Sequence, residues 1–254
     1  MTALMAGRPD VDEPWGYILC ATPRTGSTYL CSLLASTGVL GRPESYFREQ
    51  DEVAWATRFG LETEGHRVQD HPCFVDAVRE AASTENGVFG SRIMWGSIER
   101  LVEGIGRERL VSDSATLQAA LGRLAFVHLV RDDVVGQAVS WARAEQSGYW
   151  QQGDVVRSAV APDVARMLGL VETIEDHNGS WQAWFTANAI TPCVLTYEAL
   201  TSDPRATVTT IADLVGVTVP PAWRPGTAHH RQADQVNADW SDLLRSALET
   251  RDRS

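Results

Sequence analysis

The sequence predicts an α/β protein with three layers (α/β/α), in which helices cover both faces of a central parallel sheet. Short apolar segments recur along the chain, and Gly, Pro or charged residues bound them, as is typical of buried strands. Segments with helical periodicity lie between these strands, and such alternation favours a parallel sheet. The chain has 254 residues without an internal repeat or a long linker. We therefore expect a single domain over residues 1–254, with residues 1–15 as a loose N-terminal segment.

The first half of the chain is predicted to open with a strand, a tight turn and a helix. Residues 17–22 (YILCAT) are short and apolar, and Gly16 and Pro23 bound them. Residues 27–37 carry leucines at helical spacing, and Gly38 follows as a plausible end of the helix. The same criteria predict helices over residues 54–59 and 72–82, and a second strand over residues 87–95 in which Gly90 is a weak point.

The second half continues the alternation. Residues 116–121 are predicted as a short helix, because Asp113 and Ser114 before them are good capping residues. Residues 124–130 (LAFVHLV) form the clearest remaining strand, and the chain then passes through Arg131 into a helical stretch. The last predicted elements are a long helix over residues 163–188 with a candidate break at residues 178–179, a strand over 192–197 and a helix over 203–215.

Composition and charge exclude several classes of protein. Apolar residues make up 44% and charged residues 22% of the chain, which excludes a disordered, coiled-coil or collagen-like protein. Lys and Arg number 22 against 33 Asp and Glu, and this net charge of −11 argues against broad binding to nucleic acid or anionic membranes. No apolar run approaches the roughly 18 residues that a membrane span needs. The four cysteines are scattered without a Cys-x-x-Cys pair, so we expect reduced thiols and a cytoplasmic location.

The segment between the first strand and the first helix indicates an anion-binding loop. It contains Pro23, Arg24, Thr25, Gly26, Ser27 and Thr28. A loop that enters a helix N-terminus presents unpaired backbone N–H groups and a partial positive charge, which suit a phosphate-like group. Gly26 allows close approach, the two hydroxyls add donors, and Arg24 adds a permanent charge. The alternative is an ordinary capped turn with a surface arginine.

The loop lacks the features of a nucleotide triphosphatase. The spacing Gly-x-x-x-x-Gly-Lys-Ser/Thr is absent, and no apolar strand ends in an Asp that would hold magnesium. Arg131 stands where such an acid would be expected. Phosphoryl transfer normally uses magnesium, whereas a less charged sulfuryl group can be transferred by fixed donors. The loop therefore favours a phosphosulfate, and a small-molecule kinase is the less favoured alternative.

Several motifs together resemble a known family. The segments TPRTGSTYL, FVHLVR, QAVSWARA and LTYEAL resemble the sulfotransferases that use 3′-phosphoadenosine 5′-phosphosulfate (PAPS). More narrowly, GRPESYF, FGSRIMW, QSGYW and RQADQVNADW resemble bacterial carbohydrate sulfotransferases of the trehalose 2-sulfotransferase type. The resemblance covers nearly the whole chain. It implies a P-loop-like sulfotransferase fold, PAPS as sulfuryl donor, no metal, a small hydroxyl acceptor such as a sugar, polyol or secondary metabolite, and a homodimer.

The resemblance also assigns the binding residues. The loop from Pro23 to Thr28 would wrap the 5′-phosphosulfate, and Arg131 and Ser140 would bind the 3′-phosphate. An arginine offers the phosphate a planar fork that lysine cannot copy. The alternatives are a surface ion pair of Arg131 with a neighbouring aspartate, and a bond from Ser140 to its own helix backbone.

Three further positions receive roles from the resemblance. Tyr197 matches a position near the adenine, with simple packing as its alternative. Arg92 would stabilise the transferring sulfuryl group, or it would form a buried ion pair. Arg24 would stabilise charge on the bridging oxygen of the leaving group.

For the catalytic base, the sequence leaves several alternatives open. Relatives carry Glu at the position of Ser45 in Pro43-Glu44-Ser45, so Glu44 stands one residue early, and in an extended segment that turns the side chain to the opposite face. Glu44 could serve as the catalytic base after a local backbone change. Otherwise a histidine such as His66, His71 or one near the C-terminus would serve, the acceptor needs no strong base, or the chain is a non-catalytic nucleotide-binding homologue.

Overall fold

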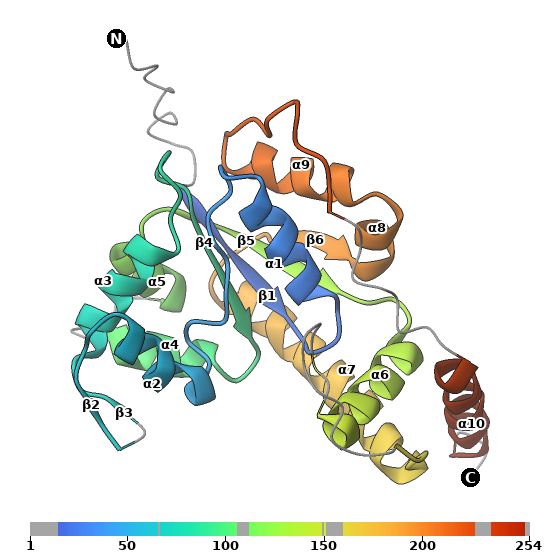
Figure 1. The fold of residues 1–254 in the computed structure, drawn as a ribbon. Helices are drawn as coiled ribbons and strands as arrows, with labels where there is room; N and C mark the ends of the chain where they lie inside the picture. The colour runs from blue at the N-terminus through green and yellow to red at the C-terminus, as the bar shows by residue number, and fades with distance from the viewer. Residues whose placement is uncertain are drawn as a thin grey trace, which may run out of the picture.

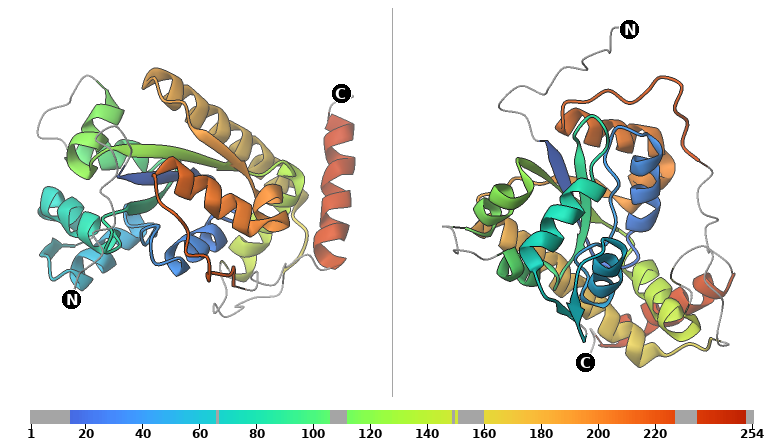
Figure 2. Two further views of the ribbon diagram at one scale, coloured as in Figure 1. Left: turned by 90° about the horizontal axis from the view of Figure 1, so that it is seen from above. Right: turned by 60° about the vertical axis from the view of Figure 1, so that its left-hand side comes forward.

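The computed structural model describes residues 15–65, 67–105, 112–148, 150, 160–226 and 235–251 (Figure 1). Its centre is a four-stranded sheet in the order β4-β1-β5-β6, with all neighbouring strands parallel. The strands are β1 (Gly16–Ala21), β4 (Phe89–Met94), β5 (Leu124–Val130) and β6 (Cys193–Thr196). Helices lie on both faces of this sheet (Figures 1 and 2), so the predicted fold class is confirmed.

Alternate residues of β1 enter two different cores, because side chains of a strand point to opposite faces. Ile18 and Cys20 pack on one face, where the core is formed with α2 (Glu49–Arg58), α3 (His71–Ala81), α4 (Ile98–Ile105), α5 (Asp113–Leu121) and α7 (Val164–Ala187). Tyr17, Leu19 and Ala21 pack on the other face, where the core is formed with α1 (Ser27–Ser36), α8 (Tyr197–Ser202) and α9 (Pro204–Leu214).

A third apolar cluster joins helices beyond the end of the sheet. It is built by α6 (Val134–Ser147), α7 and α10 (Gln235–Arg251), and Figure 1 shows α10 beside α6. Trp240 and Leu244 of α10 are buried in it. The cluster fixes the position of α6, which follows the strand that ends before Arg131.

The predicted strands and most predicted helices are confirmed to within a few residues, and three details were wrong. The long helix α7 is continuous through Asn178 and Gly179. An interior glycine costs a helix roughly 1 kcal/mol, and the buried Trp181 and Phe185 in the next turns offset that cost. Tyr197 begins α8 instead of ending the strand, because the Thr196 side chain caps that helix by accepting from the backbone N–H of residue 199. The helix predicted over residues 54–59 begins at residue 49.

Five elements were not predicted. They are the helices α4, α8 and α10 and the strands β2 (Thr63–Glu64) and β3 (Arg67–Val68), which form a small antiparallel hairpin. Helix α4 carries its buried residues Ile98, Leu101 and Val102 at helical spacing, so the signal for it was present in the sequence.

Candidate functional site

The predicted anion-binding loop lies at the carboxyl end of β1 and leads into α1. Gly26 is the N-cap of α1 and has a φ of 80°, in the left-handed region that favours glycine. A Cβ placed on Gly26 would lie 2.7 Å from Cδ2 of Tyr197. The tyrosine ring therefore packs directly on the backbone of the loop, and the loop needs glycine here for a second reason that the sequence did not reveal.

Arg24 is the second residue of the loop with a positive φ, 69°. For a residue other than glycine this conformation costs on the order of 1 kcal/mol, so other contacts must hold it. The guanidinium is directed towards α6: its Nε donates to Ser140 Oγ over 3.0 Å, and one terminal nitrogen donates to the carbonyl of Trp150 over 2.6 Å. The structure thus brings together Arg24 and Ser140, which the sequence analysis had assigned to different ends of the donor.

Arg92 extends from β4 to the start of α1. Its Nε donates to Ser45 Oγ over 2.9 Å, and NH1 donates to Thr28 Oγ1 over 2.7 Å and to Ser27 Oγ over 3.4 Å. These partners are hydroxyl groups, which leave the positive charge of Arg92 without a neutralising carboxylate in direct contact within the described part of the chain. The alternative of a buried ion pair is thereby disfavoured.

Arg131 lies just beyond the carboxyl end of β5. Its guanidinium carbon stands 4.6 Å from the centre of the Tyr197 ring, and NH2 is 3.5 Å from Asp133 Oδ2. That distance is long for a hydrogen bond but within ion-pair range, so the predicted alternative, a pair of Arg131 with a neighbouring aspartate, is present in the structure. The buried Nε of Arg131 has no hydrogen-bond partner among the described residues. Arg131 is therefore pre-positioned by the tyrosine ring while retaining donors for an anion.

Glu198 of α8 binds the turn that follows Arg131. Its carboxylate accepts from the backbone N–H of Asp132 over 3.1 Å and from that of Asp133 over 3.4 Å. Asp133 in turn caps α6, because its Oδ1 accepts from the N–H of Gly136. The ends of β5 and β6 are thus held together next to the loop.

Ser45 and Glu44 point in different directions, as the one-residue shift predicts. Ser45 is buried against Arg92, whereas Glu44 is exposed, and only its backbone carbonyl accepts from the N–H of Arg92. The Glu44 carboxylate still lies close enough to Cys31 to affect the pKa of that thiol. Burial raises the pKa of Cys31 to about 11; Arg92 lowers that pKa and Glu44 raises it.

The histidines considered as alternative bases fall elsewhere. His71 lies between α2 and α4, where its Nε2 is 3.8 Å from Glu52 Oε1 and its ring contacts Phe74. No described contact joins His71 to the loop. His66, His229 and His230 lie outside the described residues.

Three residues that the sequence analysis did not assign to the site bind the loop or the end of β1. They are Gln137, Asn178 and Trp181. Gln137 of α6 donates to the carbonyl of Pro23 over 2.8 Å. Thr22 donates to Oδ1 of Asn178, and the indole N–H of Trp181 donates to the carbonyl of the last residue of β1. For Gln137 the sequence did carry a signal, because it precedes Ser140 by three residues and so shares its helix face.

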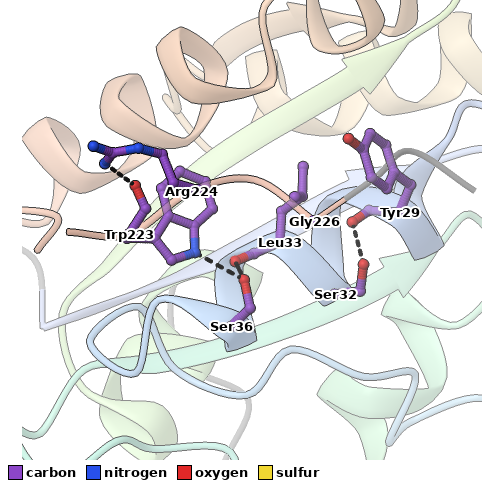
Figure 3. Close-up of a pocket in the computed structure, with 7 residues that line it drawn as sticks. All are labelled: Tyr29, Ser32, Leu33, Ser36, Trp223, Arg224 and Gly226. Atoms are coloured by element: carbon purple, nitrogen blue, oxygen red, sulfur yellow. Dashed lines mark hydrogen bonds between the residues drawn. The ribbon is translucent and has the colours of Figure 1, made fainter. Parts of the chain in front are cut away.

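A separate hollow of about 320 Å³ lies beside α1 (Figure 3). Figure 3 shows the side chains of one face of α1 turned towards the segment around Trp223; the lining residues are Tyr29, Ser32, Leu33, Ser36, Trp223, Arg224 and Gly226. The Trp223 indole donates to Ser36 Oγ over 2.9 Å. The hollow contains none of the predicted site residues, so it does not bear on their chemistry.

The described residues contain no group of three or more His, Cys, Asp or Glu side chains that could hold a metal ion. In the same stretches of chain, no helix is both long and apolar enough to span a membrane.

Comparison with known proteins gives consistent matches over the whole site. A family model described as Stf0 sulphotransferase matches residues 16–247. Two proteins named trehalose 2-sulfotransferase, from Mycobacterium tuberculosis and Mycolicibacterium smegmatis, are each 28% identical to this chain. The first match covers 91% of this chain and 94% of the relative, and the second covers 92% and 96%.

Solved structures give more distant matches. The sulfotransferase domain of the curacin biosynthetic pathway has 16% identity and a TM-score of 0.48, with 92% of this chain and 97% of that chain covered. The sulfotransferase domain of a Synechococcus olefin synthase has 17% identity and a TM-score of 0.43, with 94% and 90% covered.

Proposed function

The chain belongs to the Stf0 sulphotransferase family, and from this premise we propose that it transfers a sulfuryl group from PAPS to a hydroxyl of a small acceptor. The observation that carries the proposal is that three arginines belong to or flank the loop after β1: Arg24 lies in it, Arg92 binds Thr28, and Arg131 stacks on the tyrosine that packs on Gly26. Arg24 follows β1, while Arg92 and Arg131 come from β4 and β5, the strands on either side of β1. In a chain with a net charge of −11, such a local group of donors indicates a small anionic ligand.

The residues fit the two charged ends of the donor. The loop N–H groups and the hydroxyls of Ser27 and Thr28 suit the 5′-phosphosulfate, as at other helix N-termini that bind anions. Arg131, with its unpartnered buried Nε, and Ser140 suit the 3′-phosphate. The ring of Tyr197, packed on the loop and under the Arg131 guanidinium, would lie beside the nucleoside.

The donor, when bound, supplies an activated sulfur–oxygen bond. In the proposed step the acceptor oxygen attacks sulfur in line, and the bridging oxygen leaves with the bonding electrons on 3′-phosphoadenosine 5′-phosphate. Arg92 would stabilise the negative oxygens of the sulfuryl group, since its bonds to Thr28 and Ser45 keep its guanidinium at the loop. Arg24 would stabilise the charge that grows on the bridging oxygen, for which its guanidinium must turn from Ser140 and the Trp150 carbonyl, to which it donates here.

Glu44 is proposed to accept the proton of the acceptor hydroxyl. It is exposed, as a group that meets an incoming acceptor must be, and it lies beside the residue that contacts Arg92. Trehalose is the first acceptor to test, because both similar proteins are named for it.

A second candidate is a non-catalytic nucleotide-binding protein, and one observation favours it. Ser45, not Glu44, faces Arg92, so none of the described carboxylates is directed at the arginine that would contact the sulfuryl group. This candidate predicts tight binding of the nucleotide without transfer to any alcohol.

Calorimetric titration with 3′-phosphoadenosine 5′-phosphate in the absence of magnesium tests the donor site. Arg131→Ala should weaken binding at least tenfold, about 1.4 kcal/mol, since it removes a charged hydrogen bond. Arg79→Ala, at an exposed position on α3, is the matched control and should bind as the wild type does.

Two results would decide against the proposal. Absence of nucleotide binding, or binding only of ATP with magnesium, would contradict a sulfotransferase site. Tight binding with no transfer of radioactive sulfur from PAPS to trehalose or to a panel of sugars and polyols would instead favour the non-catalytic candidate.

A further inference from the structure

We propose that Gln137 is a positioning residue that holds the anion-binding loop in register with α6, so that the two phosphate-binding ends of the site act as one unit. The proposal rests on the function proposed above and deepens it.

The first step is the burial of Gln137. Its side chain is fully buried near the start of α6, where an apolar residue would be the cheaper choice. Its Nε2 donates to the carbonyl of Pro23 over 2.8 Å, across 114 residues of sequence. Its Oε1 has no hydrogen-bond partner in the described part of the structure. Within the described structure, the buried amide therefore forms a hydrogen bond to the loop and none to its neighbours on α6.

The second step follows from the planarity of the peptide bond. The carbonyl of Pro23 and the N–H of Arg24 belong to one trans peptide unit, so they point in opposite directions. By binding the carbonyl, Gln137 turns the N–H of Arg24 away from α6. It also secures the residue next to the left-handed conformation of Arg24, which is strained for a residue with a side chain.

The third step is that α6 makes two adjacent contacts with the loop. Gln137 and Ser140 are three residues apart and share a helix face. Gln137 binds the backbone of Pro23, and Ser140 accepts from the side chain of Arg24. The same helix begins at the turn that carries Arg131, so the loop and the 3′-phosphate residues are attached to one rigid element.

Two nucleotides measure this coupling. Adenosine 5′-phosphate engages only the loop end, whereas 3′-phosphoadenosine 5′-phosphate engages both ends. The ratio of their dissociation constants is the gain from the 3′-phosphate. Gln137→Met keeps the length of the side chain and removes both polar atoms, and Gln182→Met makes the same change at an exposed position of α7.

We expect Gln137→Met to weaken both nucleotides, because the loop itself loses a hydrogen bond. It should weaken the bisphosphate at least tenfold and the monophosphate by a smaller factor, because misaligned ends cannot both be satisfied. Gln182→Met should leave both constants as in the wild type. Gln137→Asn retains the amide but is one methylene too short to reach Pro23, so it should reproduce the effect if Gln137→Met does not fold. Melting temperatures establish that the variants compared are folded.

The outcomes separate this inference from the proposed function. Equal weakening of both nucleotides, or no weakening of either, would overturn the role of Gln137 while leaving the sulfotransferase proposal intact. Wild-type protein that binds neither nucleotide would overturn both.

Discussion

The buried His128 allows a pH dependence of stability to be worked out from the structure. It lies in β5, three residues before Arg131, and is only 5% exposed. Its ring packs against those of Trp181 and Phe185, and Nε2 has no hydrogen-bond partner among the described residues. Burial lowers the pKa of His128 from 6.5 to about 4, because the protonated ring would carry a charge into an apolar core.

The direction and size of the effect follow from these two pKa values. Between pH 6.5 and pH 4 the unfolded chain binds a proton at His128 that the folded chain does not, so acidification favours unfolding in that window. One pH unit within it corresponds to about 1.4 kcal/mol. Relative to neutral pH, we expect His128 to remove about 2 kcal/mol of stability by pH 5 and about 3 kcal/mol by pH 4.

His128→Phe isolates this contribution, since phenylalanine keeps a ring at the position and cannot be protonated. Urea denaturation followed by tryptophan fluorescence gives the free energy of unfolding of both proteins at pH 7, 6 and 5. All other groups titrate in both proteins and cancel in the difference. Between pH 7 and 5 this difference should move by about 2 kcal/mol against the wild type. A difference that stays constant over this range, or moves the other way, would refute the reasoning.

Three further predictions concern ion pairs and the site. Burial alone would raise the pKa of Glu52, but the neighbouring His71 and Arg100 lower it below the ordinary 4.5. Glu52→Gln should therefore lower the free energy of unfolding by about 1–3 kcal/mol at pH 7. In urea denaturation this difference should fade as the pH falls below 4.5 and through the lowered pKa. Arg92→Lys keeps a charge but not the planar fork that donates to Ser45, Thr28 and Ser27, so radioactive sulfur transfer should fall at least tenfold while bisphosphate affinity, by calorimetry, changes no more than about twofold. Glu198→Gln leaves one oxygen to accept two N–H groups of the Arg131 turn, and calorimetry should show bisphosphate binding weakened about threefold to tenfold.

Most of the sheet was predictable because three of its strands, β1, β4 and β5, are largely buried on both sides. The segment 124–130 coincides with β5, since a continuous apolar run needs no knowledge of its neighbours to be recognised. Helix α10 was missed for the opposite reason. It buries Trp240 and Leu244 against α6 and α7 and is polar elsewhere, so its apolar stripe is too narrow to stand out.

The candidate site divides in the same way. The loop after β1 was predictable because a strand, a glycine turn and a helix N-terminus are consecutive in sequence. The bonds that organise it were not, because they join residues far apart in the chain. Arg92 and Ser45 are 47 residues apart, Arg24 and Ser140 are 116 apart, and Gln137 reaches back 114 residues to Pro23. Only the order of the strands brings these pairs together.

The placement of arginines around the loop would also allow an acidic chain to select a small polyanion. At physiological ionic strength, exposed charges are largely screened beyond about 8–10 Å. The net charge of −11 therefore repels mainly an extended polyanion, which must lie close to much of the surface. A nucleotide small enough to reach the loop instead meets Arg24, Arg92 and Arg131 at close range. Arg131 retains the unpartnered buried Nε, and the described hydrogen bonds of Arg92 go to hydroxyls, not carboxylates. The net negative charge would thus disfavour nucleic acid, while the local donors would favour the compact ligand with two phosphate-like groups that is proposed above.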